Sequence, residues 1–589
     1  MTDTEQMMPE NDRHKSVGMI VGLAMVAVAL TTTTARAFAA NRPALIPMPS
    51  KVVMGTGQFT ITPATKVLYA KGDARLADAA AYLAGRLSQA FDKRVVAEAT
   101  GATEPRAGAI LMTTAGADVA LGDEGYRLTV TGSGVVIRAP KAAGAFYGGI
   151  TLLQLAPVEA FRGLAMVEGK LGGTQTQKPP RPCDAPNIST VKPVDSLAVP
   201  CATVTDKPRF TWRGLLIDPA RHFWTIDELK QYTDYLALHK LNSLQIHFTD
   251  HQNWCVEVKK YPDLTPDKAK IAAHPELLAN QTYHKPARRY YTQEQLKSLV
   301  AYAAKRFVRI VPEFEMPGHC GGFLRGCPEC GCTVNGKQVG GGEVCPGNEK
   351  TYQVLQGVLD EMLEIFPSQY IHIGADECGK RNWGKCSQCQ QRMKAEALKD
   401  VTALHGYFVG RMSEYLQSKG RTLVGWDEIL ESGAKKGAIG MYWRSGRADD
   451  LIKKASKNGQ YLVMTPTAHC YFDYVQSPDK KSEPQGFGRS VITLKRAYEL
   501  NPIPVDVAQV NPRLVLGAQA NLWGERMKSF PHVLYMTYPR ACALCEVAWS
   551  ADEGRDYAEF FIRLRTHMKR LDAAGINYRE PTGVDQPKQ

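Results

Sequence analysis

Short apolar runs alternate with longer amphipathic stretches along the second part of the chain. Within the amphipathic stretches apolar residues recur with a helical period, as in Ile226 to His239, Gln293 to Arg306, Lys350 to Ile365 and Ala448 to Lys457. Eight short runs predict strands: Gly214 to Asp218, Ser243 to Thr249, Arg309 to Phe314, Tyr370 to Gly374, Thr422 to Trp426, Ile439 to Trp443, Tyr461 to Met464 and Leu514 to Ala518. Because strands that alternate with helices form parallel sheets, eight units predict an α/β fold of the (β/α)8 TIM barrel type.

The first part of the chain has the pattern of a smaller α/β domain. Strands are predicted at Phe59 to Ile61, Tyr126 to Val130 and Gly134 to Ile137, and helices at Ala74 to Phe91 and Ala143 to Leu155. The predicted domains are a signal peptide at 1–40, an amino-terminal α/β domain at 41–157, an insertion or linker rich in Gly, Pro, Thr and Lys at 158–208, a catalytic barrel at 209–556, and a carboxyl-terminal helix and tail at 557–589.

The first 40 residues resemble an export signal. Arg13 and Lys15 precede an apolar run from Val17 to Leu30, and small residues follow around Ala37. The run is too short to span a bilayer, and no other stretch approaches a transmembrane span. The sequence therefore predicts an exported protein, periplasmic or secreted, with uncleaved anchoring as the alternative.

Composition and charge narrow the class of protein. The chain is 44% hydrophobic and 22% charged, which is typical of globular proteins. The formal charge of +13 is scattered, without a dense basic block or interleaved aromatic residues, so no nucleic-acid partner is expected. A cationic surface is expected instead, suited to anionic polymers such as mucins or cell envelopes.

Fourteen cysteines in an exported chain are interpreted first as disulfide partners. Cys183 and Cys201 flank the insertion and are expected to staple it. The two Cys-x-x-Cys pairs, Cys327 with Cys330 and Cys386 with Cys389, also have the spacing of a structural zinc site. Disulfides are favoured because the compartment is expected to be oxidising, and structural zinc at these four residues stays open as the alternative.

Polar and aromatic side chains gather where the predicted barrel strands end. Asp376 and Glu377 directly follow one apolar run, and carboxyl ends of strands are where barrels place their chemistry. Other strand ends carry Arg221, His222, Asp250, His251, Glu313, Glu315, His319, Trp426, Asp427, Glu428, Trp443, Arg444, Tyr471, Asp473, Trp523 and Glu525. Acids, Arg, His and Trp together favour a carbohydrate pocket. A metal site is the rival, but no HExxH, DxD or His-x-His spacing favours it.

Several motifs occur in one order. They are His372-x-Gly374-Ala375-Asp376-Glu377, Asp218-Pro-Ala-Arg221-His, His247-Phe-Thr-Asp250, Glu315-Met-Pro-Gly-His319, Gly425-Trp426-Asp427-Glu428 and Asn521-Leu-Trp523-Gly-Glu525. In these motifs the chain resembles glycoside hydrolase family 20, the exo-acting β-N-acetylhexosaminidases, from about Pro43 to Trp549. The Cys-rich loop from Cys320 to Cys345 is not a general feature of that family.

The resemblance implies a retaining mechanism in which the substrate supplies the nucleophile. Glu377 would be the general acid/base, and Asp376 would orient the 2-acetamido group and stabilise the charge that develops on its nitrogen. Tyr471 would hydrogen-bond the acetamido oxygen, which attacks the anomeric carbon to form an oxazolinium intermediate. Asp250 and His319 would orient the catalytic pair. No cofactor or metal is implied for this chemistry.

The resemblance also implies which residues bind the sugar. Arg221 would bind its 3- and 4-hydroxyls, and Asp473 and Glu525 would contact its 4- and 6-hydroxyls. The walls of the pocket would be formed by Trp426, Trp443 and Trp523. The implied partner is a glycan with a terminal, non-reducing N-acetylglucosamine or N-acetylgalactosamine, from glycoproteins, mucin-type chains or chitin oligosaccharides. A homodimer, a preference for sulfated sugars or disaccharide release, and a sugar-binding protein without turnover stay open.

Overall fold

The computed structural model describes residues 43–163, 191–265, 290–431, 433–446, 448–479, 483–484, 486–487, 490–503 and 511–587. The predicted signal peptide and Cys183 lie outside these residues. Among the helices within them, none has the length and apolar character needed to cross a membrane.

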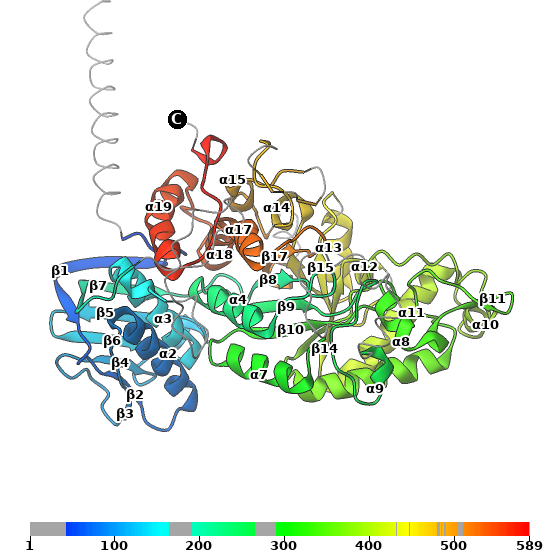
Figure 1. Ribbon diagram of the computed structural model, residues 1–589, viewed down its shortest axis with the longest axis horizontal. Coiled ribbons are helices and arrows are strands. Elements are labelled where there is room, and N and C mark those ends of the chain that lie inside the picture. Colours follow the sequence, from blue (N-terminus) through cyan, green and yellow to red (C-terminus); the bar gives the residue numbers. More distant parts are fainter. Residues whose placement is uncertain are drawn as a thin grey trace, which may run out of the picture. The chain divides into compact units, whose positions relative to one another are not determined.

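A seven-stranded mixed sheet forms the amino-terminal domain (Figure 1). Its order is β1-β7-β5-β6-β4-β2-β3, with β1 (Lys51–Ile61), β2 (Val67–Ala70), β3 (Ala97–Thr100), β4 (Ile110–Thr113), β5 (Tyr126–Thr131), β6 (Gly134–Arg138) and β7 (Leu197–Asp206). Helices α2 (Ala74–Phe91) and α3 (Ala142–Leu155) pack on the sheet and on each other. Asp73 caps α2 by accepting hydrogen bonds from the N–H groups of Arg75 and Leu76.

Strand β7 lies within 158–208, which its composition predicts to be an insertion or linker. It pairs antiparallel with β1 and with β5, so a strand that follows most of the insertion in sequence returns to complete the amino-terminal sheet. Its side chains alternate between buried and partly exposed, as expected for a strand packed on one face. The Gly, Pro and Thr content of 158–208 conceals this strand, because composition averages over the whole segment.

Eight parallel strands close into a barrel in the order β10-β13-β14-β15-β16-β17-β8-β9. They are β8 (Trp212–Ile217), β9 (Ser243–His247), β10 (Arg309–Glu313), β13 (Tyr370–His372), β14 (Thr422–Trp426), β15 (Ile439–Tyr442), β16 (Tyr461–Met464) and β17 (Val515–Leu522). The prediction of a TIM barrel preceded by a smaller α/β domain is confirmed.

Helices follow most of these strands and surround the barrel. They include α4 (Ile226–Leu238), α7 (Gln293–Ala304), α9 (Glu349–Ile365), α11 (Val401–Ser418), α13 (Ala448–Lys457), α17 (Phe530–Thr537), α18 (Arg540–Trp549) and α19 (Tyr557–Ala574). The sequence sets where two of them begin, because Thr225 with Glu228 and Thr292 with Gln295 form capping boxes at α4 and α7.

Buried ion pairs join the sheet domain to the barrel. Lys240 Nζ lies 3.1 Å from Asp206 Oδ2 at the end of β7, and both side chains are almost fully buried. Trp549 Nε1 donates to the same carboxylate at 2.9 Å. Arg213 in β8 holds Glu124 with two hydrogen bonds of 2.8 Å. Charges buried in this way must stay paired, so these contacts fix one domain against the other.

Candidate active site at the carboxyl ends of the barrel strands

Glu313 is the centre of the layer beneath the site. It pairs with His247 on one neighbouring strand and with His372 on the other, so the three side chains share one level of the barrel. Glu313 Oε2 lies 2.8 Å from His247 Nδ1, and Glu313 Oε1 lies 3.1 Å from His372 Nδ1. Trp426 Nε1 donates to Glu313 Oε1 at 3.0 Å, and Gln245 donates to Oε2 at 2.8 Å. This layer holds Trp426 in place from below.

Charge within this layer is balanced. Burial would lower the pKa of His247, but Glu313, Asp218 and Asp250 outweigh it and raise the value to about 10. Burial would also raise the pKa of Glu313, yet the two histidines hold it well below its usual range. Glu313 is therefore a buried carboxylate stabilised by its donors, which suits a supporting role.

The backbone after β13 turns so that two neighbouring carboxylates serve one site. Gly374, Ala375 and Glu377 have φ values of 67°, 70° and 47°, in the left-handed region that extended strands do not use. Glycine suits position 374 because φ is positive there and a Cβ would meet the buried carboxyl group of Glu315. The turn lets Asp376 and Glu377 escape the opposite orientations of successive strand residues.

His319 links the two carboxylates to a third. Its Nε2 lies 3.7 Å from Asp376 Oδ2 and 3.5 Å from Glu377 Oε2, and its Nδ1 lies 3.3 Å from Asp250. Burial would lower the pKa of His319, but the hydrogen bonds with Asp250 and Glu377 raise it to about 11. The imidazolium in turn holds the pKa of Glu377 below its usual range.

Arg221 is a second cation in contact with Asp250. Its guanidinium lies 3.0 Å from Asp218, 2.6 Å from Asp250 and 3.4 Å from Glu525, and it rests 5.0 Å from the ring centre of Trp523. Three carboxylates and a ring fix its orientation. A fixed guanidinium suits recognition of two adjacent hydroxyls.

Aromatic rings line the same end of the barrel. Trp426 lies 5.6 Å from Trp523, Trp523 lies 6.4 Å from Tyr471, and Tyr471 stacks at 6.3 Å on Trp443, measured between ring centres. The isolated bridge between Tyr471 and Asn521 ties the loop after β16 to β17. These flat apolar faces can pack against the C–H surface of a sugar.

Three buried carboxylates, those of Glu315, Asp376 and Asp473, have oxygen atoms without a hydrogen-bond partner in the described part of the chain, and two of them belong to the predicted sugar-binding set. In these two the atoms are Oδ1 of Asp376 and both oxygens of Asp473. Burial raises the pKa of Asp376, and Glu313 and Glu377 add to this against the opposing His319. Burial and Glu525 raise the pKa of Asp473 well above its usual range. Unsatisfied buried acceptors are costly, so these atoms are suited to donors from a ligand.

The structure thus brings the site residues predicted from sequence into one connected set. Sequence reasoning left three further acids undecided. Glu313 supports Trp426 as described above, and Asp427 accepts hydrogen bonds from the backbone N–H groups of Trp443 and Arg444. Glu428 accepts from Trp443 Nε1 at 3.1 Å, and burial beside Asp376 and Asp427 raises its pKa to about 8. In the sequence all three stand at strand ends, and Asp427 and Glu428 also stand in the Gly-Trp-Asp-Glu motif.

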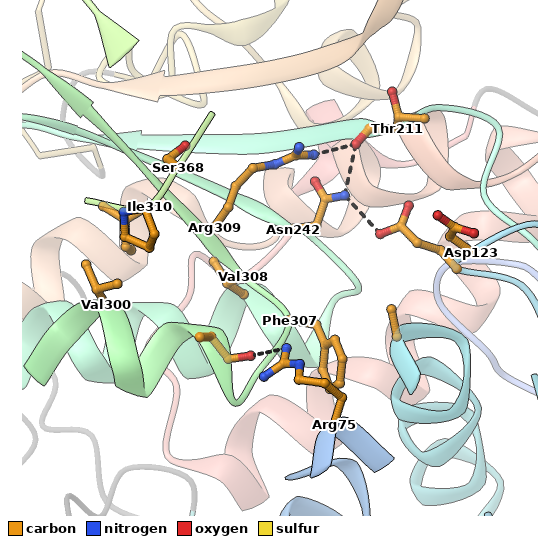
Figure 2. Close-up of a pocket in the computed structure, with 14 residues that line it drawn as sticks. Arg75, Asp123, Thr211, Asn242, Val300, Phe307, Val308, Arg309, Ile310 and Ser368 are labelled. Carbon is orange, nitrogen blue, oxygen red and sulfur yellow. Dashed lines mark hydrogen bonds between the residues drawn. The ribbon is translucent and has the colours of Figure 1, made fainter. Parts of the chain in front are cut away.

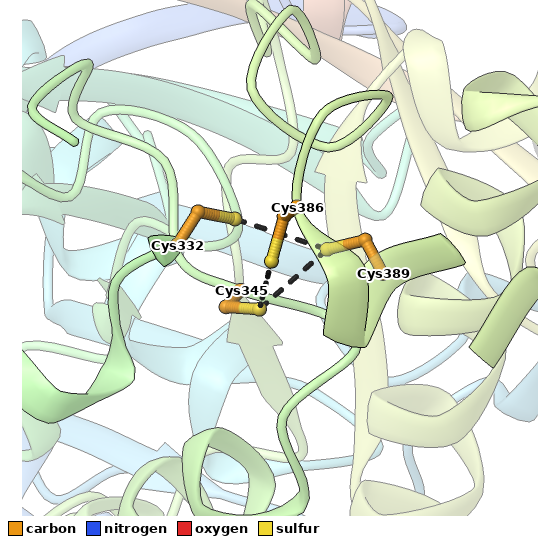
Figure 3. Close-up of side chains that lie close together, drawn as sticks. All are labelled: Cys332, Cys345, Cys386 and Cys389. Atoms are coloured by element: carbon orange, nitrogen blue, oxygen red, sulfur yellow. Dashed lines mark hydrogen bonds between the residues drawn. The ribbon is translucent and has the colours of Figure 1, made fainter. Parts of the chain in front are cut away.

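The cysteines differ from expectation. Thirteen of them lie in the described residues, and all thirteen are free thiols, so these residues do not support the predicted disulfides. The predicted zinc set is wrong in its first pair: the thiols that cluster are those of Cys332, Cys345, Cys386 and Cys389, without Cys327 or Cys330 (Figure 3). The turns of the chain between Cys330 and Cys345 determine which thiols come together, and the spacing of cysteines in the sequence does not reveal these turns.

A separate pocket of about 520 Å³ lies at the other end of the barrel, between the strand starts and the sheet domain (Figure 2). Arg309 and Asn242 both donate to the carbonyl of Thr211 there, and Arg75 lies over the ring of Phe307 at 4.3 Å. The site residues named above do not line it. In TIM barrels this end carries stability and not chemistry.

Comparisons with known proteins agree with this architecture. The model of the glycosyl hydrolase family 20 catalytic domain matches residues 210–552, and the model of domain 2 of that family matches residues 42–207. The chain is 34% identical over 545 residues to a beta-hexosaminidase of Porphyromonas gingivalis, covering 91% of this chain and 64% of that protein. It is 31% identical over 453 residues to a beta-hexosaminidase of Akkermansia muciniphila, covering 76% and 83% of the two chains.

Solved structures resemble the whole two-domain arrangement. The GH20 beta-N-acetylhexosaminidase of Streptomyces coelicolor superposes with a TM-score of 0.72 at 27% identity, covering 92% of this chain and 99% of that chain. A mutant Streptomyces plicatus beta-hexosaminidase in complex with the product GlcNAc gives a TM-score of 0.73 at 28% identity, covering 93% and 98%.

Proposed function

Since the chain belongs to glycosyl hydrolase family 20, we propose that it is an exo-acting β-N-acetylhexosaminidase that removes terminal β-linked N-acetylglucosamine or N-acetylgalactosamine from the non-reducing ends of glycans. The observation that carries the proposal is the arrangement at the end of β13. Asp376 and Glu377 face the same nitrogen of His319, and Asp376 keeps one buried oxygen without a partner in the described structure.

This arrangement favours substrate assistance over an enzyme nucleophile. In ordinary retaining glycosidases the acid and the nucleophile stand on opposite sides of the scissile bond. Asp376 and Glu377 instead converge on one side, so one of them protonates while the other serves the neighbouring acetamido group. The free oxygen of Asp376 would accept the hydrogen bond of the acetamido N–H.

In the first step the acetamido oxygen forms a bond to the anomeric carbon while the glycosidic C–O bond breaks. Glu377 gives its proton to the departing oxygen, and Asp376 stabilises the positive charge on the oxazolinium ring. Tyr471 would donate its phenolic hydrogen to the acetamido oxygen and direct it at the carbon. Burial, Asp473 and Asp376 raise the pKa of Tyr471 well above its usual value, so this proton stays in place.

In the second step a water molecule attacks the anomeric carbon from the face that the leaving group vacated. Glu377 takes the proton of that water, the oxazolinium ring opens, and the acetamido group and the β configuration are restored. Arg221, Asp473 and Glu525 would hold the hydroxyls of the terminal sugar, while Trp426, Trp443 and Trp523 would enclose it. All bonds are accounted for by the substrate, water and one carboxyl proton, so no metal is assigned to the reaction.

A series of aryl β-N-acetylglucosaminides whose acetamido methyl carries zero to three fluorine atoms tests this mechanism. Fluorine lowers the basicity of the attacking oxygen, so kcat/KM should fall progressively, and the matching 2-hydroxy glycoside should be almost inert. The proposal fails if the rate is insensitive to fluorine, or if mass spectrometry finds a deactivated fluorosugar bound covalently to a carboxylate. Failure to release any aryl group would overturn the hexosaminidase activity itself.

Export to the periplasm or the medium is part of the proposal and rests on the charged and apolar pattern of residues 1–40. The expected substrates there are mucin-type, glycoprotein or chitin-derived glycans. Fractionation of cells that express the full chain tests it: activity should accompany the periplasm or medium, and activity confined to the cytoplasm would contradict export.

A further inference from the structure

Four cysteine thiols from two loops meet at the edge of the barrel (Figure 3). Cys332 and Cys345 lie in the long loop after β10, around the hairpin of β11 (Thr333–Val334) and β12 (Lys337–Gln338). Cys386 and Cys389 lie after β13, at the start of α10 (Ser387–Ala395), which Figure 1 shows beside β11. The two loops are those that carry His319 and the Asp376–Glu377 pair.

The distances between the sulfur atoms identify the kind of site. Cys345 Sγ lies 3.5 Å from Cys389 Sγ and 3.7 Å from Cys386 Sγ, and Cys332 Sγ lies 3.8 Å from Cys389 Sγ. All four sulfurs lie within 4.8 Å of one another. A tetrahedral zinc ion with Zn–S bonds of about 2.3 Å separates its sulfurs by about 3.8 Å. Two disulfides would instead bring the sulfurs pairwise to about 2.05 Å.

The surroundings favour thiolates. All four cysteines are buried in a small core with Trp383 and Leu404, separate from the core of the barrel. Cys386 is the N-cap of α10 and Cys389 stands in its first turn, where the helix dipole lowers the cost of negative sulfur.

We propose that Cys332, Cys345, Cys386 and Cys389 bind one structural Zn²⁺ ion. Four thiolates in a tetrahedron leave no coordination position for water, so the ion stabilises structure and takes no part in hydrolysis. Iron–sulfur clusters also use four thiolates, but these are divided between two irons or among four, so the set of four sulfurs is spread more widely than it is here.

The position of the ion assigns its role, which is to join the two loops behind the catalytic groups. Hydrogen bonds already join the loops at this place: Asn382 donates to the carbonyl of Gly340, and Trp383 Nε1 donates to the carbonyl of Val344. The N–H of Cys320, next to His319, donates to the carbonyl of Gly342 in the same loop. Zinc would lock this loop against the one that bears Asp376 and Glu377.

Metal analysis of the purified, dialysed full chain tests the proposal. We expect about one zinc per chain in the wild type, and far less in Cys345→Ser and Cys389→Ser. The matched controls are Cys327→Ser and Cys330→Ser, which change buried cysteines outside the cluster and should keep the zinc. Iron in place of zinc, a metal-free wild type, or zinc lost from the control variants would overturn the assignment.

A second measurement does not depend on the variants folding. Wild-type protein produced in cobalt-supplemented medium should show the absorption of tetrahedral Co²⁺ bound to thiolates, and addition of zinc should remove it. Absence of that absorption together with an intact mass that lacks four hydrogens, the signature of two disulfides, would refute the proposal. Because both readouts ignore sugar hydrolysis, their outcome is independent of the proposed function.

Discussion

Glu377 must hold a proton before it can give one to the leaving group, and His319 sets how readily it does so. The imidazolium stabilises the carboxylate form of Glu377, which lowers the pKa of this acid. In the free enzyme the proton is therefore lost at a lower pH than in an isolated glutamic acid. The basic limb of the profile of kcat/KM against pH reports this loss.

We expect His319→Asn to move the basic limb of that profile to higher pH. Without the cation the carboxylate form of Glu377 loses stabilisation, so the pKa of Glu377 rises and the protonated acid persists further into the alkaline range. His251→Asn is the control, because burial lowers the pKa of His251 and its neutral ring exerts no such effect. A limb that stays in place or moves to lower pH in His319→Asn would contradict the pairing.

Glu377→Gln should leave the fold intact and remove the proton donor. The loss in kcat/KM should be about 10²- to 10⁴-fold for substrates with poor leaving groups, and much smaller for the first step with nitrophenyl leaving groups. Comparing a natural disaccharide with an aryl glycoside measures the difference. Equal losses for both, with a lowered melting temperature, would show structural damage instead of a lost acid.

At the scale of elements, the turn after β13 decides whether two neighbouring acids can share one site. Gly374→Ala would place a methyl group against the carboxyl group of Glu315 and force the turn to move. Since a displacement of about 1 Å can cost about 10²-fold in rate, kcat/KM should fall by that order while the far-ultraviolet circular dichroism is kept.

Gly420→Ala is the matched control for this prediction. Gly420 also has a positive φ, of 70°, but a Cβ there would meet no atom within 4 Å. It should therefore cost some stability and almost no activity. Equal loss of activity in the two variants would show that backbone strain alone, and not the contact with Glu315, is responsible.

The elements also show how far the sequence can be interpreted. Each of the eight barrel strands was predicted within a few residues, because a buried parallel strand is a local apolar run. Strand β7 was missed, since its partners β1 and β5 are distant in sequence and its own segment follows a loop-like composition. The clustered thiols were half missed for the same reason: Cys386 and Cys389 share a helix turn, whereas Cys332 and Cys345 meet them only through the tertiary fold.

The same contrast, between local patterns and contacts made only in the tertiary fold, applies to the site residues. Asp376 and Glu377 were predicted because both stand directly at the end of one strand. Arg221, Tyr471 and Asp473 were predicted from the ends of other strands, and the resemblance supplied their roles. The roles of Glu313 and Gly374 depend on contacts between strands. No local pattern shows that Glu313 accepts a hydrogen bond from Trp426, or that Gly374 leaves space for Glu315.

At the scale of the whole molecule, the interface between the sheet domain and the barrel, called the seam below, joins the two domains. Both domains belong to one compact unit, Leu45–Gln589. Asp206, at the end of β7, lies at this seam and accepts hydrogen bonds from Lys240, Tyr126 and Trp549. Burial lowers the pKa of Lys240, and Asp206 is the main group that opposes this. The late strand of the sheet is thereby tied to the start of the barrel.

We expect Asp206→Ala to lower the free energy of unfolding by about 3–5 kcal/mol, since it leaves a charged lysine buried without its partner. Asp195→Ala is the control, because Asp195 pairs with Lys93 at the surface and is 96% exposed, so its loss should change stability little.

All eight tryptophans lie at or after residue 212, so fluorescence reports the barrel, while hydrogen exchange of β5 and β7 reports the sheet. If the seam joins the domains, Asp206→Ala should lower the midpoint of denaturant unfolding by the same amount for both signals. A sheet that loosens while the barrel signal keeps its midpoint would mean that the pair stabilises the sheet domain alone.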